Sequence, residues 1–157
     1  NINYFPIQLL FIPKIYCNRG LNECVLTSFK MIAILINNLR TISEVQNDFS
    51  KEFPFLKLEF FDAVYVPEKA LPKSKMFPQD KKLGAIRKTQ KEGKIIVARQ
   101  QTVNDLEREL LEKFRLSAQV FRKSGNLWIE TSLTDSWTLE QQNREGYEMS
   151  KLHYKND

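Results

Sequence analysis

Two stretches of similar pattern decide the fold: AILINNLRTISEVQNDFSKEF at residues 33–53 and KIIVARQQTVNDLERELLEKF at residues 94–114. An offset of 61 aligns them without a gap, with three identical positions and seven more that keep their chemistry. The identical pairs are Ile34/Ile95, Thr41/Thr102 and Phe53/Phe114. In each stretch a β-branched apolar run precedes a Thr, and apolar residues at helical spacing follow it. The pattern predicts a strand and then a helix, twice, and indicates an internal repeat.

The starts and buried faces of both helices can be predicted in detail. Thr41 and Thr102 are the expected N-caps, and each has an acid three residues later, Glu44 or Asp105, where the helix dipole favours negative charge. The predicted buried stripes are Ile42, Val45, Phe49 and Phe53 in the first helix, and Val103, Leu106, Leu110 and Phe114 in the second. Phe53 and Phe114 should therefore occupy equivalent buried sites.

Each helix leads into a second predicted strand, at residues 55–61 and 117–122. Tandem β-α-β units are typical of a ferredoxin-like split βαβ sandwich, in which both helices cover one face of an antiparallel sheet. We therefore predict an α+β fold of two tandem β-α-β units plus a C-terminal β-hairpin strand and helix. Another α+β sandwich stays open, as does a three-layer α/β arrangement in which a helix at residues 80–92 crosses the opposite face.

The segments outside the two units carry weaker patterns. Residues 127–133 alternate apolar and polar side chains, which predicts a hairpin partner for the preceding strand. If Ser124-Gly125 is the two-residue turn, Phe121 faces Trp128. A final helix is predicted over residues 138–150, although Gly146 interrupts it. The short helix predicted between the units would end at Gly93, with Leu83 and Ile86 as its anchors.

The length of 157 residues corresponds to one domain. Residues 1–30 lack a sustained period, so we expect a leader or extension of doubtful structural role, a single domain over residues 31–152 that opens with a strand at Met31, and a tail at residues 153–157. A secretory leader on residues 5–16 is the alternative to a cytoplasmic location. That run is shorter than the roughly 20 apolar residues of a membrane-spanning helix.

Composition and motifs narrow the chemistry. Apolar residues make up 42% and charged residues 27%, which is typical of a soluble globular chain. The five glycines do not form a phosphate-binding or dinucleotide-binding loop, so nucleotide hydrolysis is not expected. Cys17, Cys24 and His153 are too few for a zinc site, and the two cysteines are expected to be ordinary thiols. No metal or cofactor is therefore expected.

The positive charge is local. Residues 62–99 hold ten basic and four acidic residues, whereas the rest of the chain holds 14 basic and 15 acidic residues. A lysine-rich connection is most often a solvated surface. The functional alternative is phosphate contact without sequence reading. The residues that would make this contact are Lys81, Lys82, Arg87, Lys88 and Lys91.

A second candidate surface lies in the stretch RKSGNLWIETSLTDSWT at residues 122–138. Alternation places Trp128 and Glu130 on one face of the predicted strand and Leu127 and Ile129 on the other. We expect Trp128 to pack under the last helix, because tryptophan is usually well buried, and the open alternative is that it faces a partner. The candidate binding residues are Arg122, Lys123, Trp128, Glu130, Asp135 and Trp137.

Three functions are compatible with these surfaces. The first is a small non-enzymatic module that binds a protein or other macromolecule through the exposed sheet face and the hairpin. The second is a nucleic-acid-binding protein that uses the basic 69–94 segment. The third is an enzyme with an acid pair at Glu130 and Asp135. The fold by itself does not separate them, because such folds host unrelated activities.

Overall fold

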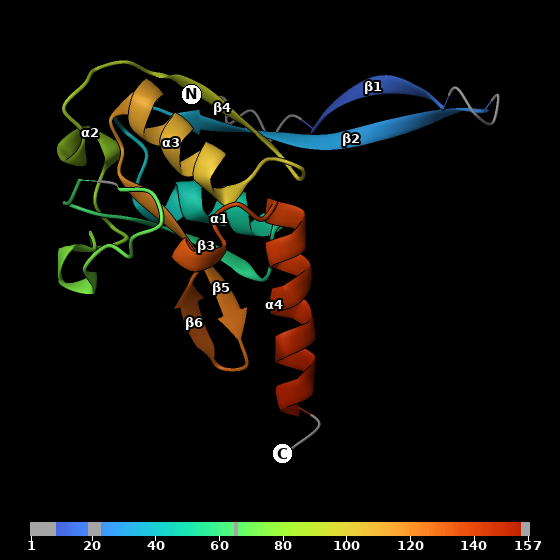
Figure 1. Cartoon of the computed structure of the whole chain (residues 1–157). Coiled ribbons are helices and arrows are strands. Elements are labelled where there is room, and N and C mark those ends of the chain that lie inside the picture. The colour runs from blue at the N-terminus through green and yellow to red at the C-terminus, as the bar shows by residue number, and fades with distance from the viewer. Residues whose placement is uncertain (1–8, 19–22, 65, 155–157) are drawn as a thin grey trace.

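The computed structural model describes residues 9–18, 23–64 and 66–154. Its architecture is mixed α+β, with two three-stranded antiparallel sheets and four α-helices in these residues (Figure 1). The elements are β1 (Leu9–Asn18), β2 (Glu23–Ile36), α1 (Ile42–Glu52), β3 (Leu56–Phe60), the 3-10 turn η1 (Lys73–Lys75), α2 (Leu83–Ile86), β4 (Gly93–Ala98), α3 (Val103–Phe114), β5 (Ala118–Ser124), β6 (Leu127–Glu130), the 3-10 turn η2 (Ser132–Thr134) and α4 (Leu139–Tyr154).

Both sheets join the two units strand to strand. The first sheet has the order β1-β2-β4 and the second the order β3-β5-β6, and all pairs are antiparallel. Ile34 lies directly opposite Ile95, so the two positions aligned by the offset of 61 are register partners. In the second sheet Leu58 lies opposite Val120. Equivalent strands of the two units therefore pair antiparallel in both sheets.

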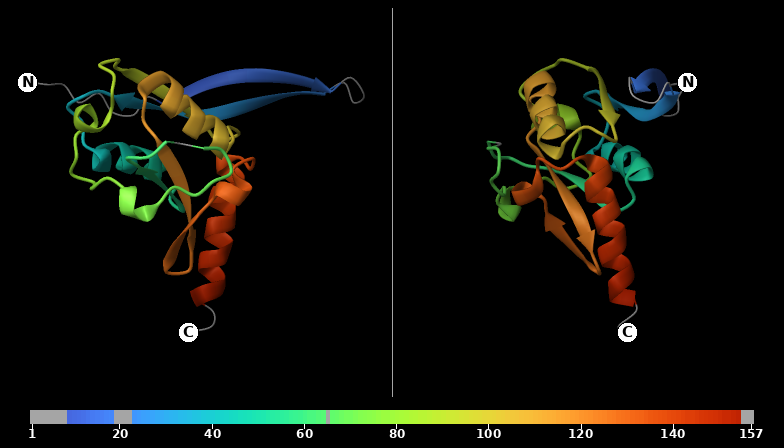
Figure 2. Two further views of the ribbon diagram at one scale, coloured as in Figure 1. Left: turned by 60° about the vertical axis from the view of Figure 1, so that its left-hand side comes forward. Right: turned by 45° about the vertical axis from the view of Figure 1, so that its right-hand side comes forward.

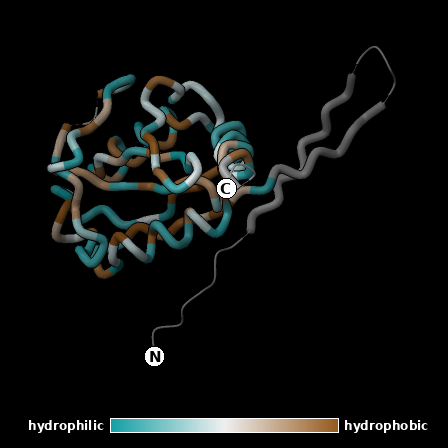
Figure 3. Tube along the Cα trace, turned by 90° about the horizontal axis from the view of Figure 1, so that it is seen from below, coloured by the Kyte–Doolittle hydropathy of each residue, from teal (hydrophilic) through white to brown (hydrophobic). Residues whose placement is uncertain are grey.

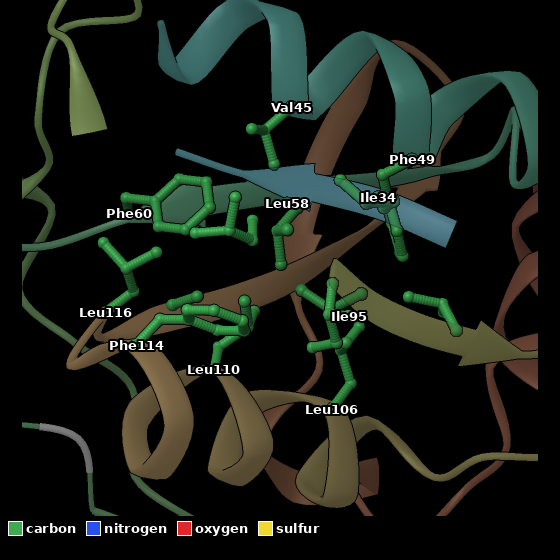
Figure 4. Packing of buried hydrophobic residues seen from close by; sticks show 14 of the residues in the cluster. Ile34, Val45, Phe49, Leu58, Phe60, Ile95, Leu106, Leu110, Phe114 and Leu116 are labelled. Carbon is green, nitrogen blue, oxygen red and sulfur yellow. The ribbon is translucent and has the colours of Figure 1, made fainter. Parts of the chain in front are cut away.

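The presence of two separate sheets is the difference from the expected ferredoxin-like arrangement. That arrangement needs both helices on one face of a single sheet. Instead, α1 and α3 close the core from opposite sides, with Val45 and Phe49 entering from one side and Leu106 and Leu110 from the other (Figure 4). The strands are divided between two three-stranded sheets, so the two helices do not share one face of a single sheet.

The predicted helix starts and stripes are confirmed. Thr41 and Glu44 form a reciprocal capping box, and the Asp105 N–H donates to Thr102 Oγ1 at 3.1 Å. All eight predicted stripe residues are buried, including Phe53 and Phe114. Burial of each large apolar side chain contributes about 1.5–3 kcal/mol. The two stripes thus supply much of one shared core.

That core lies between the sheets and the two helices. Hydrophilic and hydrophobic residues alternate along much of the chain in the body of the molecule (Figure 3), so strands and helices send one face inward. A smaller second cluster contains Phe61, Leu71 and Phe121, with Ala63 and Met76 packed against it. It fixes part of the connection between β3 and β4 to the second sheet.

The same hydrogen bonds surround the start of each helix. The Ile42 N–H donates to Lys81 O at 2.9 Å, and Leu83, the first residue of α2, donates to Arg40 O at 2.8 Å. In the second unit Val103 donates to Trp137 O at 3.1 Å. The remaining bonds of the two sets are Ser43 to Gln79 O and Gly84 to Asn38 O in the first unit, and Asn104 to Asp135 O, Leu139 to Gln101 O and Glu140 to Arg99 O in the second. In the first unit α2 therefore occupies the place that α4 occupies in the second. A common origin of the units stays a prediction.

The N-terminal part differs from the expected strand start. β2 begins at Glu23 rather than at Met31, and it pairs with β1 from Leu9 opposite Ile32 to Asn18 opposite Glu23. This hairpin extends away from the body (Figure 1). Residues 1–8 and 19–22 lie outside the described residues, and the expected domain boundaries stay a prediction.

Two of the later elements differ from the predicted bounds. The helix expected over residues 80–92 is only the four-residue α2, and Gly93 opens β4 instead of ending a helix. Arg87 accounts for the early end, because its guanidinium donates to Asn38 Oδ1 and to Lys91 O and holds the following chain in an extended path. In contrast, α4 runs on to Tyr154. Gly146 allows this helix to approach the second sheet closely, since a Cβ there would lie 2.9 Å from Phe55 Cβ, just before β3, and 3.1 Å from Arg122 Cγ on β5.

The hairpin turn is displaced by one residue from the prediction. Ser124 pairs with Leu127, so Gly125 and Asn126 form the two-residue turn, and Trp128 lies opposite Lys123 rather than Phe121. Gly125 has a φ of 57° at the first central position, where a type II′ turn favours glycine. The cross-strand partner changes by two residues, so the face that carries each side chain is unchanged.

Candidate functional site

The structure divides the six candidate hairpin residues between two faces of the second sheet. Arg122 lies on the face that α4 covers, where its Nη1 donates to Gln142 Oε1 at 2.7 Å. Its Cζ lies 5.8 Å from the centre of the Trp137 ring, within the range of a cation-π contact. Gln142 is fully buried and also donates to Thr134 O at 2.7 Å. Arg122 and Trp137 are therefore brought together and fixed by α4.

Lys123 and Trp128 lie on the opposite face. They are direct register partners on β5 and β6, and alternation places them away from Arg122 and its contacts with α4. Trp128 is 37% exposed. The expectation that it packs under the last helix is therefore wrong, because α4 covers the face that carries Arg122. Within the described residues, Trp128 lies on the outermost strand of its sheet.

Glu130 and Asp135 do not form a pair of acids. Asp135 is buried, and its Oδ2 accepts a hydrogen bond from the Glu68 N–H at 3.2 Å while its carbonyl accepts from Asn104 N–H. Glu130 is exposed and lies opposite Phe121. Among the residues that the structure describes, no contact joins the two carboxylates. Asp135 thus holds loops together, and the geometry offers no support for acid-base chemistry at these two residues.

The sequence analysis missed an apolar rim beside the hairpin. Leu127 is 69% exposed and Leu152 of α4 is 62% exposed. Met149 of α4 is also exposed, and the Ser124 Oγ lies 3.9 Å from its sulfur, which connects the tip of the hairpin to the helix. The signal available in the sequence was that apolar residues are few and irregularly spaced near the C-terminus, so those that do not face inward stay exposed.

β6 itself is an edge strand. It pairs with β5 on one side, and in the part of the chain that the structure describes its other side has no strand partner. We call Leu127, Trp128, Met149 and Leu152, together with this free edge, the apolar edge. A free edge presents unpaired backbone donors and acceptors, and here apolar side chains flank them.

The lysines of the connection between β3 and β4, together with Lys94 at the start of β4, are a second surface. Eight lysines are exposed, and none of them forms an ion pair with any residue that the structure describes. They are Lys69, Lys73, Lys75, Lys81, Lys82, Lys88, Lys91 and Lys94, and we call them the lysine surface. Basic residues elsewhere commonly have acidic partners: Lys30 with Glu52, Arg40 and Lys51 with Asp48, Lys57 with Glu59, Arg108 with Asp105 and Lys113 with Glu109.

Arg87 differs from the four lysines with which the sequence analysis grouped it. Its side chain is fully buried, and its Nε donates to Asn38 Oδ1 at 2.9 Å. Burial lowers the pKa of Arg87, and the negative charge of Glu92 opposes this shift. Arg87 therefore fixes the connection to the body and is not available to a ligand.

The structure describes the two cysteines and the histidine only in part. Cys17 and Cys24 are register partners on β1 and β2, and their side chains lie outside those described, as does the side chain of His153. Within the described residues, no group of three or more His, Cys, Asp and Glu side chains could hold a metal ion. The helices of these residues include none with the length and apolar character needed to cross a membrane.

Comparison with known proteins adds no family to this description. No family model matches the chain, and neither a curated protein nor a solved structure matches it. Function must therefore be argued from the two surfaces.

Proposed function

We propose that the protein is a small non-enzymatic binding module that contacts a protein partner through the apolar edge. The observation that carries this proposal is the coincidence of a free strand edge with exposed Leu127 and Trp128 on one short strand. An extended segment of a partner can add a strand to such an edge, with backbone hydrogen bonds giving affinity and alternate side chains giving specificity.

The surroundings of β6 support this mode of binding. Leu127 and Trp128 lie on opposite faces of β6, so each can contact one face of an added strand, while Met149 and Leu152 add exposed apolar surface on α4 beside β5. Aromatic and methionine side chains are enriched at protein interfaces. The stacking of Arg122 on Trp137 and its bond to Gln142 hold β5 and α4 together. The edge is therefore presented by a fixed support.

The test is photo-crosslinking in extract, with the reactive residue at position 129 and capture after washing at about 1 M salt, where screening reduces charge attraction to within ~3 Å. The parent and the double variant Leu127→Lys/Trp128→Lys both carry the crosslinker at position 129. The parent should capture a protein partner, and the double variant should fail to capture it. Leu39→Lys is the matched control, because Leu39 is 70% exposed on the first unit.

Retention of the captured protein in Leu39→Lys and its loss in the double variant would support the proposal. Equal capture by all three proteins, or capture that disappears from the parent at high salt, would contradict it.

A further inference from the structure

We propose that the lysine surface binds the phosphate backbone of duplex nucleic acid without reading its sequence. This inference goes beyond the proposed function, because it concerns a different surface and a different class of ligand. It rests on eight exposed lysines without ion pairs to the described residues, all on one ordered segment.

The first step is the availability of the charges. The connection has three exposed acids that could offset the charge of the eight lysines: Asp62, Glu68 and Asp80. Its fourth acid, Glu92, is already engaged, because it accepts the Asn38 N–H at 2.8 Å and lies beside the buried Arg87. The lysines therefore outnumber the nearby free acids. Lysine acts as a point charge toward phosphate and needs no fixed fork geometry.

The second step is the order of the backbone that carries these lysines. Lys69 O accepts from Gln119 Nε2 at 2.8 Å, Lys75 O from Asp62 N–H at 2.8 Å and Lys81 O from Ile42 N–H at 2.9 Å. Buried Leu71 and Leu83 anchor the same segment. The backbone is thus held in place while the side chains extend into solvent, which lowers the ordering cost of binding a ligand.

The third step is the choice of ligand. Between residues 67 and 95 no large hydrophobic side chain is exposed, whereas membrane-surface segments combine basic with apolar residues. Phe77 is the sole aromatic residue in this range and packs against the core, so no stacking platform for single strands is present there. Lysine is depleted at protein interfaces. A ligand that requires only regularly spaced negative charge, the duplex backbone, fits these observations best.

The fourth step is position. η1 and α2, which carry or adjoin several of these lysines, lie on the side of the body away from α4 in all three views (Figures 1 and 2). The lysines around α2, from Lys81 to Lys94, therefore lie apart from the apolar edge, whereas the stretch around Lys69 and Leu71 packs against Gln119 and Phe121 of β5.

The experiment measures fluorescence anisotropy of a dye-labelled duplex of mixed sequence with the full chain at several salt concentrations. The parent should show a log-log salt slope near −4 to −5, since about four to six phosphate contacts each release roughly 0.9 of a counterion. The quadruple variant Lys81→Gln/Lys82→Gln/Lys88→Gln/Lys91→Gln should lose more than half of this slope. The matched control removes the same charge on α1, α3 and α4 through Lys51→Gln, Arg108→Gln, Lys113→Gln and Arg144→Gln, and it should keep most of the slope.

Both variants should melt at the temperature of the parent, because all eight substituted side chains are exposed. Absence of duplex binding at low salt would overturn the inference, as would equal weakening in both quadruple variants. Tighter binding to anionic lipid vesicles, to polyglutamate or to a single strand than to the duplex would also overturn it. If the lysine quadruple variant loses duplex binding and still captures the protein partner through the apolar edge, the two proposals concern independent surfaces.

Discussion

The two units share one backbone plan and differ in the segments that come after their second strands. In the first unit β3 leads into a long connection that returns along it, with Phe61 bridged to Met76, and ends in the four-residue α2. In the second unit β5 turns tightly into β6, and the 16-residue α4 follows. The core constrains the central strands and the helices α1 and α3, because both units contribute side chains to it. The segments outside the core can differ, and they carry a cationic surface in one unit and an apolar edge in the other.

The largest effect is expected when a buried phenylalanine is removed from equivalent core positions of the two units. Phe53→Ala and Phe114→Ala should each lower the free energy of unfolding by about 3–5 kcal/mol, because both rings are buried and the cavity adds to the lost transfer free energy. Urea unfolding of the two variants measures this. A cost below ~1 kcal/mol for either one would show that the units do not share the core equally.

The equivalence of α2 and α4 can be tested at their first residues. Leu83 and Leu139 are both fully buried and both follow the same hydrogen-bond pattern. Leu83→Ala and Leu139→Ala should therefore each cost about 2–5 kcal/mol in the same unfolding measurement. If only Leu139→Ala were destabilising, α2 would be a surface turn and not the counterpart of α4.

A smaller effect is expected at the helix caps. Removal of the hydroxyl in Thr41→Ala or Thr102→Ala should cost about 1 kcal/mol, because the N–H of Glu44 or Asp105 then loses its acceptor. Thermal melting of the two single variants and the double variant measures both costs. Equal and additive values support equivalent caps, whereas a cost at only one threonine would separate the two helices.

The sequence predicted the local features of the fold and not the pairing of its strands. Caps and stripes could be predicted because Thr41 and Glu44, or Thr102 and Asp105, interact within one helical turn. The antiparallel pairing of Ile34 with Ile95 depends on contacts between distant residues, which local patterns do not encode. The ferredoxin-like expectation assumed that the strands of both units join one sheet, whereas they are divided between two sheets.

The candidate surfaces could be predicted only in outline. Local charge identified the connection, but Arg87 has the same sequence context as its lysine neighbours and is distinguished by its bonds to Asn38 and Lys91. The position of Trp128 was wrong because alternation assigns faces without showing which face the last helix covers. Asp135 was grouped with Glu130 by closeness in sequence, and its contact with Glu68 is visible only in three dimensions.

The central claim is that the two units present two separate binding surfaces, and amide spectra of the nitrogen-labelled chain during titration with a mixed-sequence duplex test it most directly. The account predicts that the largest shifts fall within residues 69–94 and that residues 122–137 stay nearly unchanged. Largest shifts within residues 122–137, or shifts spread evenly over both units, would contradict it.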